Sequence, residues 1–482
     1  MSHLRTPTLA AFVLFGTVAA CQPEAEPTVH DLVLAGGRVM DPESGADSVL
    51  NVGIRDGVVV SVTADTLLGE EVMDVSGLVV APGFIDLHAH GQDPFSRDLQ
   101  VRDGVTTALE LESGGYPIEE WYAERQDWRI NHGASASYSE ARRLAFDSAA
   151  GETIYGRADE ARVAEIQRHL EAELSRGALG VGLGLQYLPG AGRPEIFRMF
   201  QTAAEHGVTV FVHVRYSGVL EPTSAIAAVQ EMVGNAAGTG ASVHVVHIGS
   251  TGLSQMGPVL EMIAGAQEVG VDVTTEIYPY TAASTSIGSA IFDPGWRQRL
   301  GANYGDIEWV ATGERLDAGS FARRRSQGGI VIAHIIPEEA MLQALVHPIV
   351  MVASDGVAFV NGRAHPRGAG TFARVLGRYS RDEGRLGLME ALRKMTLMPA
   401  RRLEAMVPEM AAKGRVSPGA DADLTVFDPE TVLDRATFVD PDQPSTGIPH
   451  VLVGGVFVVR DGELVDFAEG TAPGRAIRRT RK

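Results

Sequence analysis

The stretch Gly83-Phe84-Ile85-Asp86-Leu87-His88-Ala89-His90 follows an apolar run, Gly77-Leu78-Val79-Val80-Ala81-Pro82, and contains two histidines two residues apart. Because side chains alternate along a strand, His88 and His90 are predicted to point the same way at a strand's carboxyl end. A (β/α)₈ barrel collects its catalytic groups at that end, and two neutral imidazoles suit a divalent metal such as zinc. A chain of 482 residues with 14 histidines contains about 0.4 such pairs by chance, so the strand context gives the pair its weight.

Further apolar runs alternate with helical stretches, in the rhythm of βαβ units. Together with the strand before His88 they give eight candidates, the number that a closed barrel needs. We therefore predict an α/β fold with a (β/α)₈ barrel over residues 83–409. The predicted strands are 107–111, 180–185, 209–214, 242–248, 271–278, 329–334 and 349–353.

Both ends of the chain have a different texture, with short alternating strands broken by Gly and Asp. The first end has such runs at 32–34, 49–54, 58–62 and 72–75, and the second at 419–427 and 450–462. We expect residues 31–82 and 410–470 to pair into one small β-sandwich domain beside the barrel.

The composition indicates a folded protein with a large core, because 45% of the residues are hydrophobic. A formal net charge of −20 provides no basic excess to neutralise phosphates, so nucleic acid and anionic lipid are excluded as partners. Homo-oligomerisation is left open by the sequence.

The N-terminus departs from this pattern. Arg5 precedes an apolar stretch at 9–20, and Val18-Ala19-Ala20-Cys21 resembles a bacterial lipobox, in which the cysteine is lipidated. Cys21 is the only cysteine in the sequence, which excludes a disulfide framework. We expect residues 1–21 to be a lipoprotein signal peptide and 22–30 a tether. The protein is then exported and anchored by its lipid to a membrane facing the periplasm, with no other membrane contact.

Three more predicted strands end in residues that can bind a metal. His213 and His247 close successive strands, and Asp355 closes the last, where a carboxylate can bind metal and take a proton from bound water. His244 is expected to face away from His247 on a regular strand, so it is left out of the ligand set. We interpret the other candidate histidines as structural: His206, His334 and His347.

Glu110 and Glu112 share one face of an otherwise apolar strand. A carboxylate facing the packed helices would need a partner to offset its desolvation, whereas facing cations inside the barrel is cheaper. Glu112 lies nearer the strand end and is our candidate for a metal-bridging carboxylate, with Glu110 supporting it or structural. Pairing of one of them with Arg102 is the alternative.

The chain resembles the metal-dependent amidohydrolase superfamily and, within it, the N-acyl-D-amino-acid deacylases (D-aminoacylases). The resemblance covers about residues 31–478. It is carried by the following segments: 83–90, Gly177-Ala178-Leu179-Gly180-Val181-Gly182, Glu276-Ile277-Tyr278-Pro279-Tyr280, Ser354-Asp355-Gly356, and 365–377, which begins His365-Pro366-Arg367-Gly368.

The resemblance implies a zinc-dependent hydrolase that cleaves the linear amide of a small N-acyl-D-amino acid or short peptide. It implies that His213 and His247 hold the tightly bound zinc, that His88 and His90 hold a second metal, and that Asp355 is the metal-bound catalytic acid/base. The substrate carboxylate is then held by Tyr278, Ser284 and Arg367.

Two positions depart from the family pattern. Glu112-Ser113 stands where the family usually supplies a bridging cysteine, so one or two zinc ions remain open, and Gly249 stands where it often has a lysine. A dipeptidase, a cyclic-amide hydrolase or a deaminase could use the same ligands, and a non-catalytic periplasmic binding lipoprotein is the non-enzyme alternative. Whether residues 292–304 form a lid is also left open.

Overall fold

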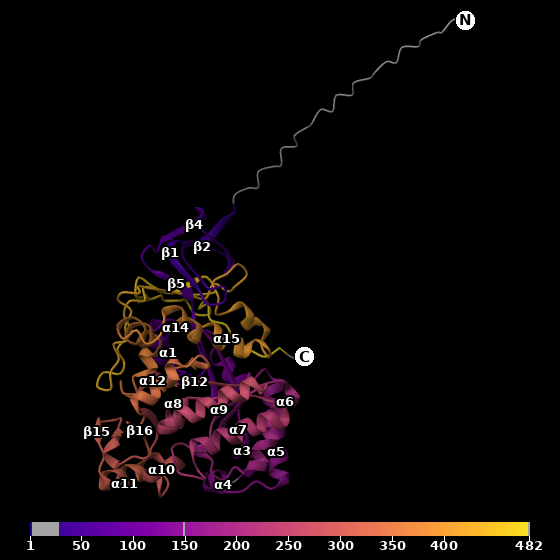
Figure 1. Cartoon of the computed structure of the whole chain (residues 1–482), viewed down its shortest axis with the longest axis vertical. Helices are drawn as coiled ribbons and strands as arrows, with labels where there is room; N and C mark the ends of the chain where they lie inside the picture. The colour runs from indigo at the N-terminus through magenta and orange to yellow at the C-terminus, as the bar shows by residue number, and fades with distance from the viewer. Residues whose placement is uncertain (2–27, 148–149, 481–482) are drawn as a thin grey trace.

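The computed structural model describes Met1, residues 28–147 and residues 150–480. Cys21 and the predicted signal peptide therefore lie outside the described residues. Figure 1 shows an elongated molecule with the N-terminal strands at one end and a barrel in the middle. Among the described residues, no helix is long and apolar enough to cross a membrane.

Eight parallel strands form the barrel, which confirms the predicted fold class. Their order in the sheet is β17-β12-β11-β10-β9-β8-β7-β6. A backbone hydrogen bond of 2.7 Å from Gly91 to Gly356, beyond the ends of β6 and β17, nearly closes the ring. The strands are β6 (Phe84–Asp86), β7 (Val105–Gly115), β8 (Asn131–Ser137), β9 (Gly180–Gly184), β10 (Thr209–His213), β11 (Ser242–Val245), β12 (Val273–Ile277) and β17 (Val350–Val352).

One predicted barrel strand was wrong. The run 329–334 forms β16 (Ile330–Ala333) in a separate sheet, and the missing barrel strand is β8. The sequence of β8, Asn131-His132-Gly133-Ala134-Ser135-Ala136-Ser137, is fully buried but built of small and polar residues. It lacks the branched apolar side chains by which a strand is predicted, whereas the apolar β16 has them.

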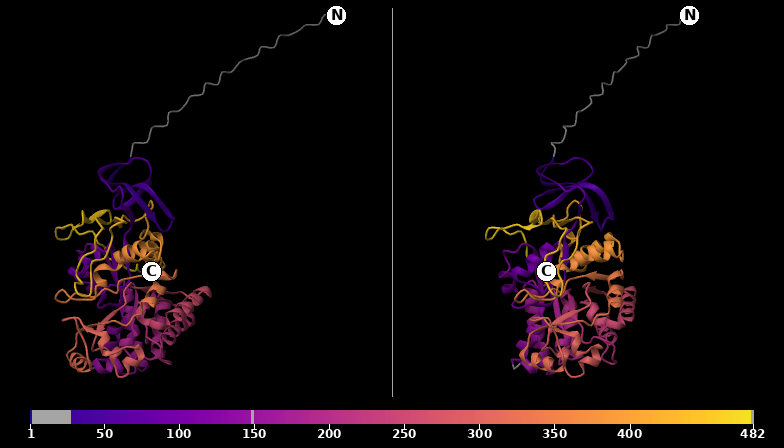
Figure 2. Two further views of the ribbon diagram at one scale, coloured as in Figure 1. Left: turned by 60° about the vertical axis from the view of Figure 1, so that its left-hand side comes forward. Right: turned by 90° about the vertical axis from the view of Figure 1, so that its left-hand side faces the viewer.

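Helices surround the barrel and connect its strands (Figures 1 and 2). They are α1 (Pro94–Arg102), α2 (Ile118–Ala123), α3 (Tyr138–Phe146), α4 (Ala150–Tyr155), α5 (Glu160–Ser175), η1 (Leu185–Tyr187), α6 (Arg193–His206), α7 (Ala225–Thr239), α8 (Ile248–Gly252), η2 (Leu253–Gln255), α9 (Met256–Glu268), α12 (Glu338–Val346), α13 (Arg367–Arg374), the π-helix η5 (Val375–Asp382), α14 (Leu388–Met395), α15 (Leu397–Glu404) and η6 (Pro408–Ala412). Their apolar faces pack on the strands to form the main core, as a barrel requires.

Strands from both chain ends form a second sheet of nine strands, seen in indigo and yellow in Figure 2. Strands β5 and β18, far apart in sequence, pair antiparallel and join the two halves. The sheet has its own apolar core, which includes Leu34, Val52 and Leu424. Its strands are β1 (Val29–Asp41), β2 (Ala46–Arg55), β3 (Val58–Thr63), β4 (Leu68–Asp74), β5 (Val79–Pro82), β18 (Leu424–Phe427), β19 (His450–Val453), β20 (Val456–Arg460) and β21 (Glu463–Leu464).

The segment between β12 and α12 forms a small cap with an aromatic core that includes Phe292, Trp296 and Phe321. Its four strands pair in the order β13-β16-β14-β15, at the end of the molecule opposite the N-terminal sheet (Figure 1). The cap contains β13 (Ala283–Ser286), η3 (Ala290–Phe292), α10 (Trp296–Leu300), η4 (Tyr304–Asp306), β14 (Ile307–Trp309), β15 (Glu314–Arg315), α11 (Ala318–Gln327) and β16.

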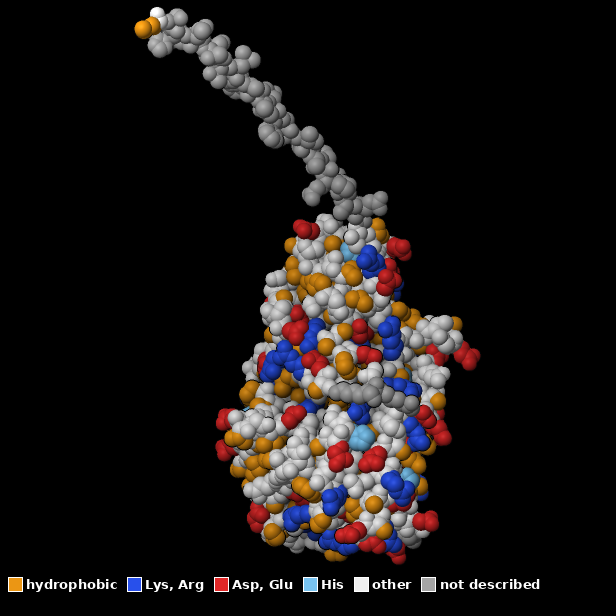
Figure 3. Space-filling model, turned by 90° about the vertical axis from the view of Figure 1, so that its right-hand side faces the viewer, with side chains coloured by type: hydrophobic (Ala, Val, Ile, Leu, Met, Phe, Trp, Pro, Cys, Tyr) orange, Lys and Arg blue, Asp and Glu red, His pale blue; other side chains and the backbone are white. Residues whose placement is uncertain are grey.

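Surface charge is mixed rather than segregated on the face shown in Figure 3, where acidic and basic side chains alternate with apolar ones. The negative net charge of the sequence is thus not gathered into one patch on this face.

Candidate metal centre and active site

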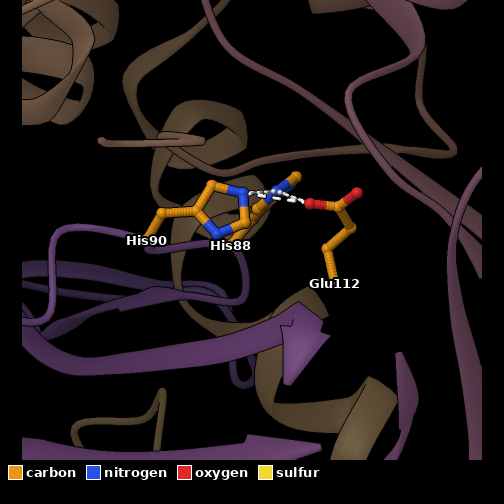
Figure 4. Close-up of side chains that lie close together, drawn as sticks. All are labelled: His88, His90 and Glu112. Carbon is orange, nitrogen blue, oxygen red and sulfur yellow. Dashed lines mark hydrogen bonds and ion pairs between the residues drawn. The ribbon is translucent and has the colours of Figure 1, made fainter. Parts of the chain in front are cut away.

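The four histidines predicted as ligands meet at the carboxyl ends of the barrel strands. Ligand atoms of His88, His90 and Glu112 lie within 4.8 Å of one another, and so do those of Glu112, His213 and His247. Glu112 belongs to both groups. Figure 4 shows both imidazoles of the first group directed at the Glu112 carboxylate.

The carboxylate of Glu112 presents one oxygen to each pair of histidines. Its Oε2 lies 3.0 Å from His90 Nε2 and 3.5 Å from His88 Nε2. Its Oε1 lies 3.5 Å from Nδ1 of His213. A carboxylate that bridges two metal ions needs this arrangement, in which each oxygen faces a different ligand pair.

An irregularity in β7 carries Glu112 to this position. The pairing of β7 with β8 is regular up to Glu110 and then shifts register before Gly115, so the segment between them leaves the ladder. A β-carbon on Gly182 of β9 would lie 2.3 Å from the backbone oxygen of Glu112. Only a glycine at position 182 lets the backbone at Glu112 approach β9 so closely, which explains why this position of β9 is a glycine.

Second carboxylates orient the first two imidazoles. His88 donates its Nδ1–H to Glu276 Oε1 at 2.6 Å, and His90 donates its Nδ1–H to Glu110 Oε2 at 2.8 Å. In the neutral imidazole, each bond fixes the tautomer and directs the lone pair of Nε2 toward Glu112. Glu110 thus lies in the supporting position predicted for it.

The other two histidines are oriented by neutral groups. His213 donates its Nε2–H to Gln186 Oε1 at 2.8 Å, and Nδ1 of His247 lies 3.1 Å from Ser250 Oγ. His213 Nδ1 and His247 Nε2, 2.9 Å apart, are the atoms that remain to converge on a metal.

Sequence reasoning missed the partners Glu276, Gln186 and Ser250. Glu276 had a signal, because it is an acid near the end of a predicted barrel strand, as Glu110 and Glu112 are. The two alternatives considered for nearby residues are resolved. Arg102 pairs with Glu463 at 3.2 Å rather than with either strand carboxylate. His244 bonds Thr274 and Glu276 and belongs to neither ligand group.

The charges of this cluster fit a bound cation. Burial opposes ionisation of Glu112, but bonds from His213, His88 and His90 lower its pKa well below the usual value. Burial disfavours a charged His90, but Glu110 and Glu112 raise its pKa to about 10. Imidazole nitrogens with fixed tautomers and carboxylate oxygens are the donors that zinc prefers, so the residues fit one or two zinc ions.

Asp355 follows β17 and faces the first pair of histidines. Its Oδ1 lies 3.5 Å from Nε2 of both His88 and His90. Its Oδ2 forms an ion pair of 2.9 Å with Nη2 of Arg367. Its backbone has φ of 50°, and that of His247 has 33°. Left-handed backbone at non-glycine residues costs free energy and gathers at functional sites.

The residue before Asp355 is tied to the first strand. Backbone N–H groups of Ser354 and His88 both donate to Asp86 Oδ1, at 3.0 and 3.1 Å. Burial raises the pKa of Asp86 to about 6. Through Asp86, the segment that carries Asp355 and the segment that carries His88 are held in a fixed relation at the closure of the barrel.

A cavity of about 230 Å³ opens beside these groups, and Tyr278 and Ser284 line it. The hydroxyls of both residues are buried without a hydrogen-bond partner among the described residues. The same holds for Nε and Nη1 of Arg367, whose guanidinium lies 4.5 Å from the centre of the Tyr278 ring. Unpaired buried donors are costly, so this set is suited to an anion that is supplied by a ligand.

The predicted segment 292–304 belongs to the cap. Phe292 and Leu300, together with Ile291, line the cavity from that side. The segment therefore covers the cavity, and Ser284 also reaches it from cap strand β13.

Comparison with known proteins gives a consistent result. The sequence profile of the amidohydrolase family matches residues 138–459. An N-acyl-D-glutamate deacylase of Alcaligenes xylosoxydans xylosoxydans is 31% identical over 93% of this chain and 96% of its own length. A D-aminoacylase of the same organism is 28% identical over 95% of this chain and 99% of its own length.

One solved structure is informative for the metal. The N-acyl-D-glutamate deacylase of Bordetella bronchiseptica was solved with zinc and a phosphonate inhibitor that mimics the tetrahedral intermediate of the reaction. It superimposes with a TM-score of 0.79, at 28% identity, over 94% of this chain and all of that chain.

Proposed function

Because this chain belongs to the amidohydrolase family, we propose that it is a zinc-dependent hydrolase that cleaves the amide bond of N-acyl-D-amino acids. One observation carries the proposal. The two histidine pairs that share Glu112 lie beside Asp355, and Asp355 contacts Arg367, one of three residues with unpaired donors for an anion. A metal centre next to a carboxylate receptor matches a substrate whose scissile amide lies close to a carboxylate.

Zinc bound here would lower the pKa of water and polarise a carbonyl group. The protein residues perform the remaining steps. Arg367 offers Nε and Nη1, and Tyr278 and Ser284 offer hydroxyls, to hold the substrate carboxylate. Holding that group fixes the orientation of the amide before reaction.

Asp355 is the group placed to move protons. It lies among the Nε2 atoms of the first histidine pair and can accept a proton from water as the water attacks the amide carbon. The same carboxyl then donates that proton to the departing nitrogen of the amino acid. No covalent intermediate is needed, and Cys21, the only cysteine in the sequence, lies far from Asp355 along the chain.

The test is a substrate panel. We expect zinc-loaded protein to release free amino acid from N-acetyl-D-amino acids and not from their L enantiomers. Release from neither series, with zinc bound, would contradict the proposal. Assays with dipeptides and cyclic amides would then decide between the other chemistries that the same ligands can perform.

We also propose that the protein is an exported lipoprotein attached through Cys21. The proposal rests on the lipobox-like residues 18–21 of the sequence. We expect the full chain, expressed in a bacterial host, to sediment with membranes. The Cys21→Ser variant is expected to lose that association and keep its hydrolytic activity. A full chain recovered wholly in the soluble fraction would refute the anchor.

A further inference from the structure

The cavity beside the metal centre differs in character from one wall to the other. The catalytic wall carries His90, His213, His247, Glu112 and Asp355. The opposite wall is largely apolar, and its members are Ile291, Phe292, Leu300, Ala333 and Ile335. Among the described residues that line the cavity, none is a lysine or an arginine. A second carboxylate on a substrate would therefore find no cation on this wall.

The two guanidinium groups in the adjoining hollow already have hydrogen-bond partners. A hollow that shares Gln186, Ser217 and Ile291 with the cavity contains Arg215 and Arg299. Arg215 pairs with both oxygens of Glu231, at 2.8 and 2.9 Å, and also donates to the Ala191 carbonyl. Arg215 cannot turn to a substrate carboxylate without losing these bonds.

Arg299 is engaged in a different way. Its two terminal nitrogens donate to the carbonyl oxygens of Pro294, Ile291 and Asp293, at 2.9 to 3.3 Å. Arg367 remains, and it already serves Asp355 and the carboxylate that all N-acyl-amino acids share. One free guanidinium edge cannot neutralise two substrate carboxylates.

The apolar wall begins directly beside the carboxylate receptor. Ser284, one of the unpaired donors, follows Ala283 in β13, and Ala283 is paired with Ala333 of β16. Ile335 lies two residues beyond Ala333 and also lines the cavity. With the substrate carboxylate at Ser284, the group that branches from the substrate's α-carbon would lie close to Ala283, Ala333 and Ile335.

We infer that this enzyme selects N-acyl-D-amino acids with neutral, apolar side chains and rejects acidic ones, with Ile335 as a specificity-determining residue. The inference rests on the proposed function. It runs against the identity of 31% to an N-acyl-D-glutamate deacylase, because it follows the cavity wall of this chain instead. Burying an unpaired carboxylate against apolar side chains is costly, whereas a leucine side chain gains from the same burial.

The test compares kcat/KM for N-acetyl-D-leucine, N-acetyl-D-glutamate and N-acetyl-D-aspartate with the zinc-loaded enzyme. We expect leucine to be favoured by about 100-fold or more over both acidic substrates. Equal or better hydrolysis of an acidic substrate would overturn the inference while leaving the proposed function intact. Failure to hydrolyse any of the three, together with the wider D panel, would instead overturn the proposed function.

A charge-introducing variant tests the role of Ile335. Ile335→Lys places an ammonium on the apolar wall, and we expect the leucine-to-glutamate ratio to fall by about 10-fold or more. Ile335→Met is the matched control, since it is equally long and flexible but uncharged, and it should keep the ratio near the wild-type value. An unchanged ratio in a folded, zinc-loaded Ile335→Lys protein would remove Ile335 from the specificity site.

Discussion

Replacing Asp355 with asparagine is expected to lower kcat by about 10²- to 10⁴-fold, the range by which a general acid/base accelerates a reaction. The amide is nearly the same size as the carboxylate and can still accept a bond from Arg367, so the fold and the cavity should persist. It cannot take a proton from water or return one to the leaving amine. The measurement is single-substrate kinetics on the best D substrate of the panel, with zinc content determined on the same samples.

The control is Asp466→Asn. Asp466 is fully exposed, and its nearest ion pair, with Arg129, is 3.8 Å long. The same chemical change there should leave kcat unaltered. If Asp355→Asn kept near wild-type kcat with full zinc occupancy, Asp355 could not be the proton carrier, and the role would pass to another group in the cavity.

The barrel could be predicted from the sequence where strands are apolar and end in residues that can bind a metal or transfer a proton. This applies to β10 with His213 and to β17 with the following Asp355. It failed at β8, because a strand that carries Gly133 followed by two Ala-Ser pairs gives no hydrophobic period. Burial there is decided by the surrounding barrel and not by the segment itself.

The metal ligands could be predicted because strand alternation is a local rule, but their supporting partners could not. Glu276 reaches His88 across 188 positions of the chain, and Gln186 reaches His213 across 27. Such contacts depend on which strands become neighbours in the sheet, and the local sequence of neither segment determines that order. The ion pair between Asp355 and Arg367 was missed for the same reason, since sequence reasoning gave these residues separate tasks.

Glu112→Gln should have the other large effect, on metal binding. Glu112 is the member common to both ligand groups, so a neutral amide in its place removes the negative charge that two metal positions would share. Loss of a group that merely supports a ligand costs about 10- to 100-fold in metal affinity, and loss of a bridging ligand should cost at least as much. We expect zinc stoichiometry to fall and zinc affinity to drop by about 100-fold or more. The measurement is a titration of metal-free protein with zinc, followed by calorimetry and by elemental analysis.

Glu110→Gln is the matched comparison, because Glu110 lies on the same face of β7 and contacts the ligand set through His90 Nδ1, while its other oxygen accepts the backbone N–H of Ser113 at 3.2 Å. Its loss should loosen one histidine and leave the Glu112 bridge in place, so its effect on zinc stoichiometry should be the smaller of the two. Equal zinc content and affinity in Glu112→Gln and the wild type would show that Glu112 is not a ligand. The two histidine pairs would then bind independently, and the displaced course of β7 would need another explanation.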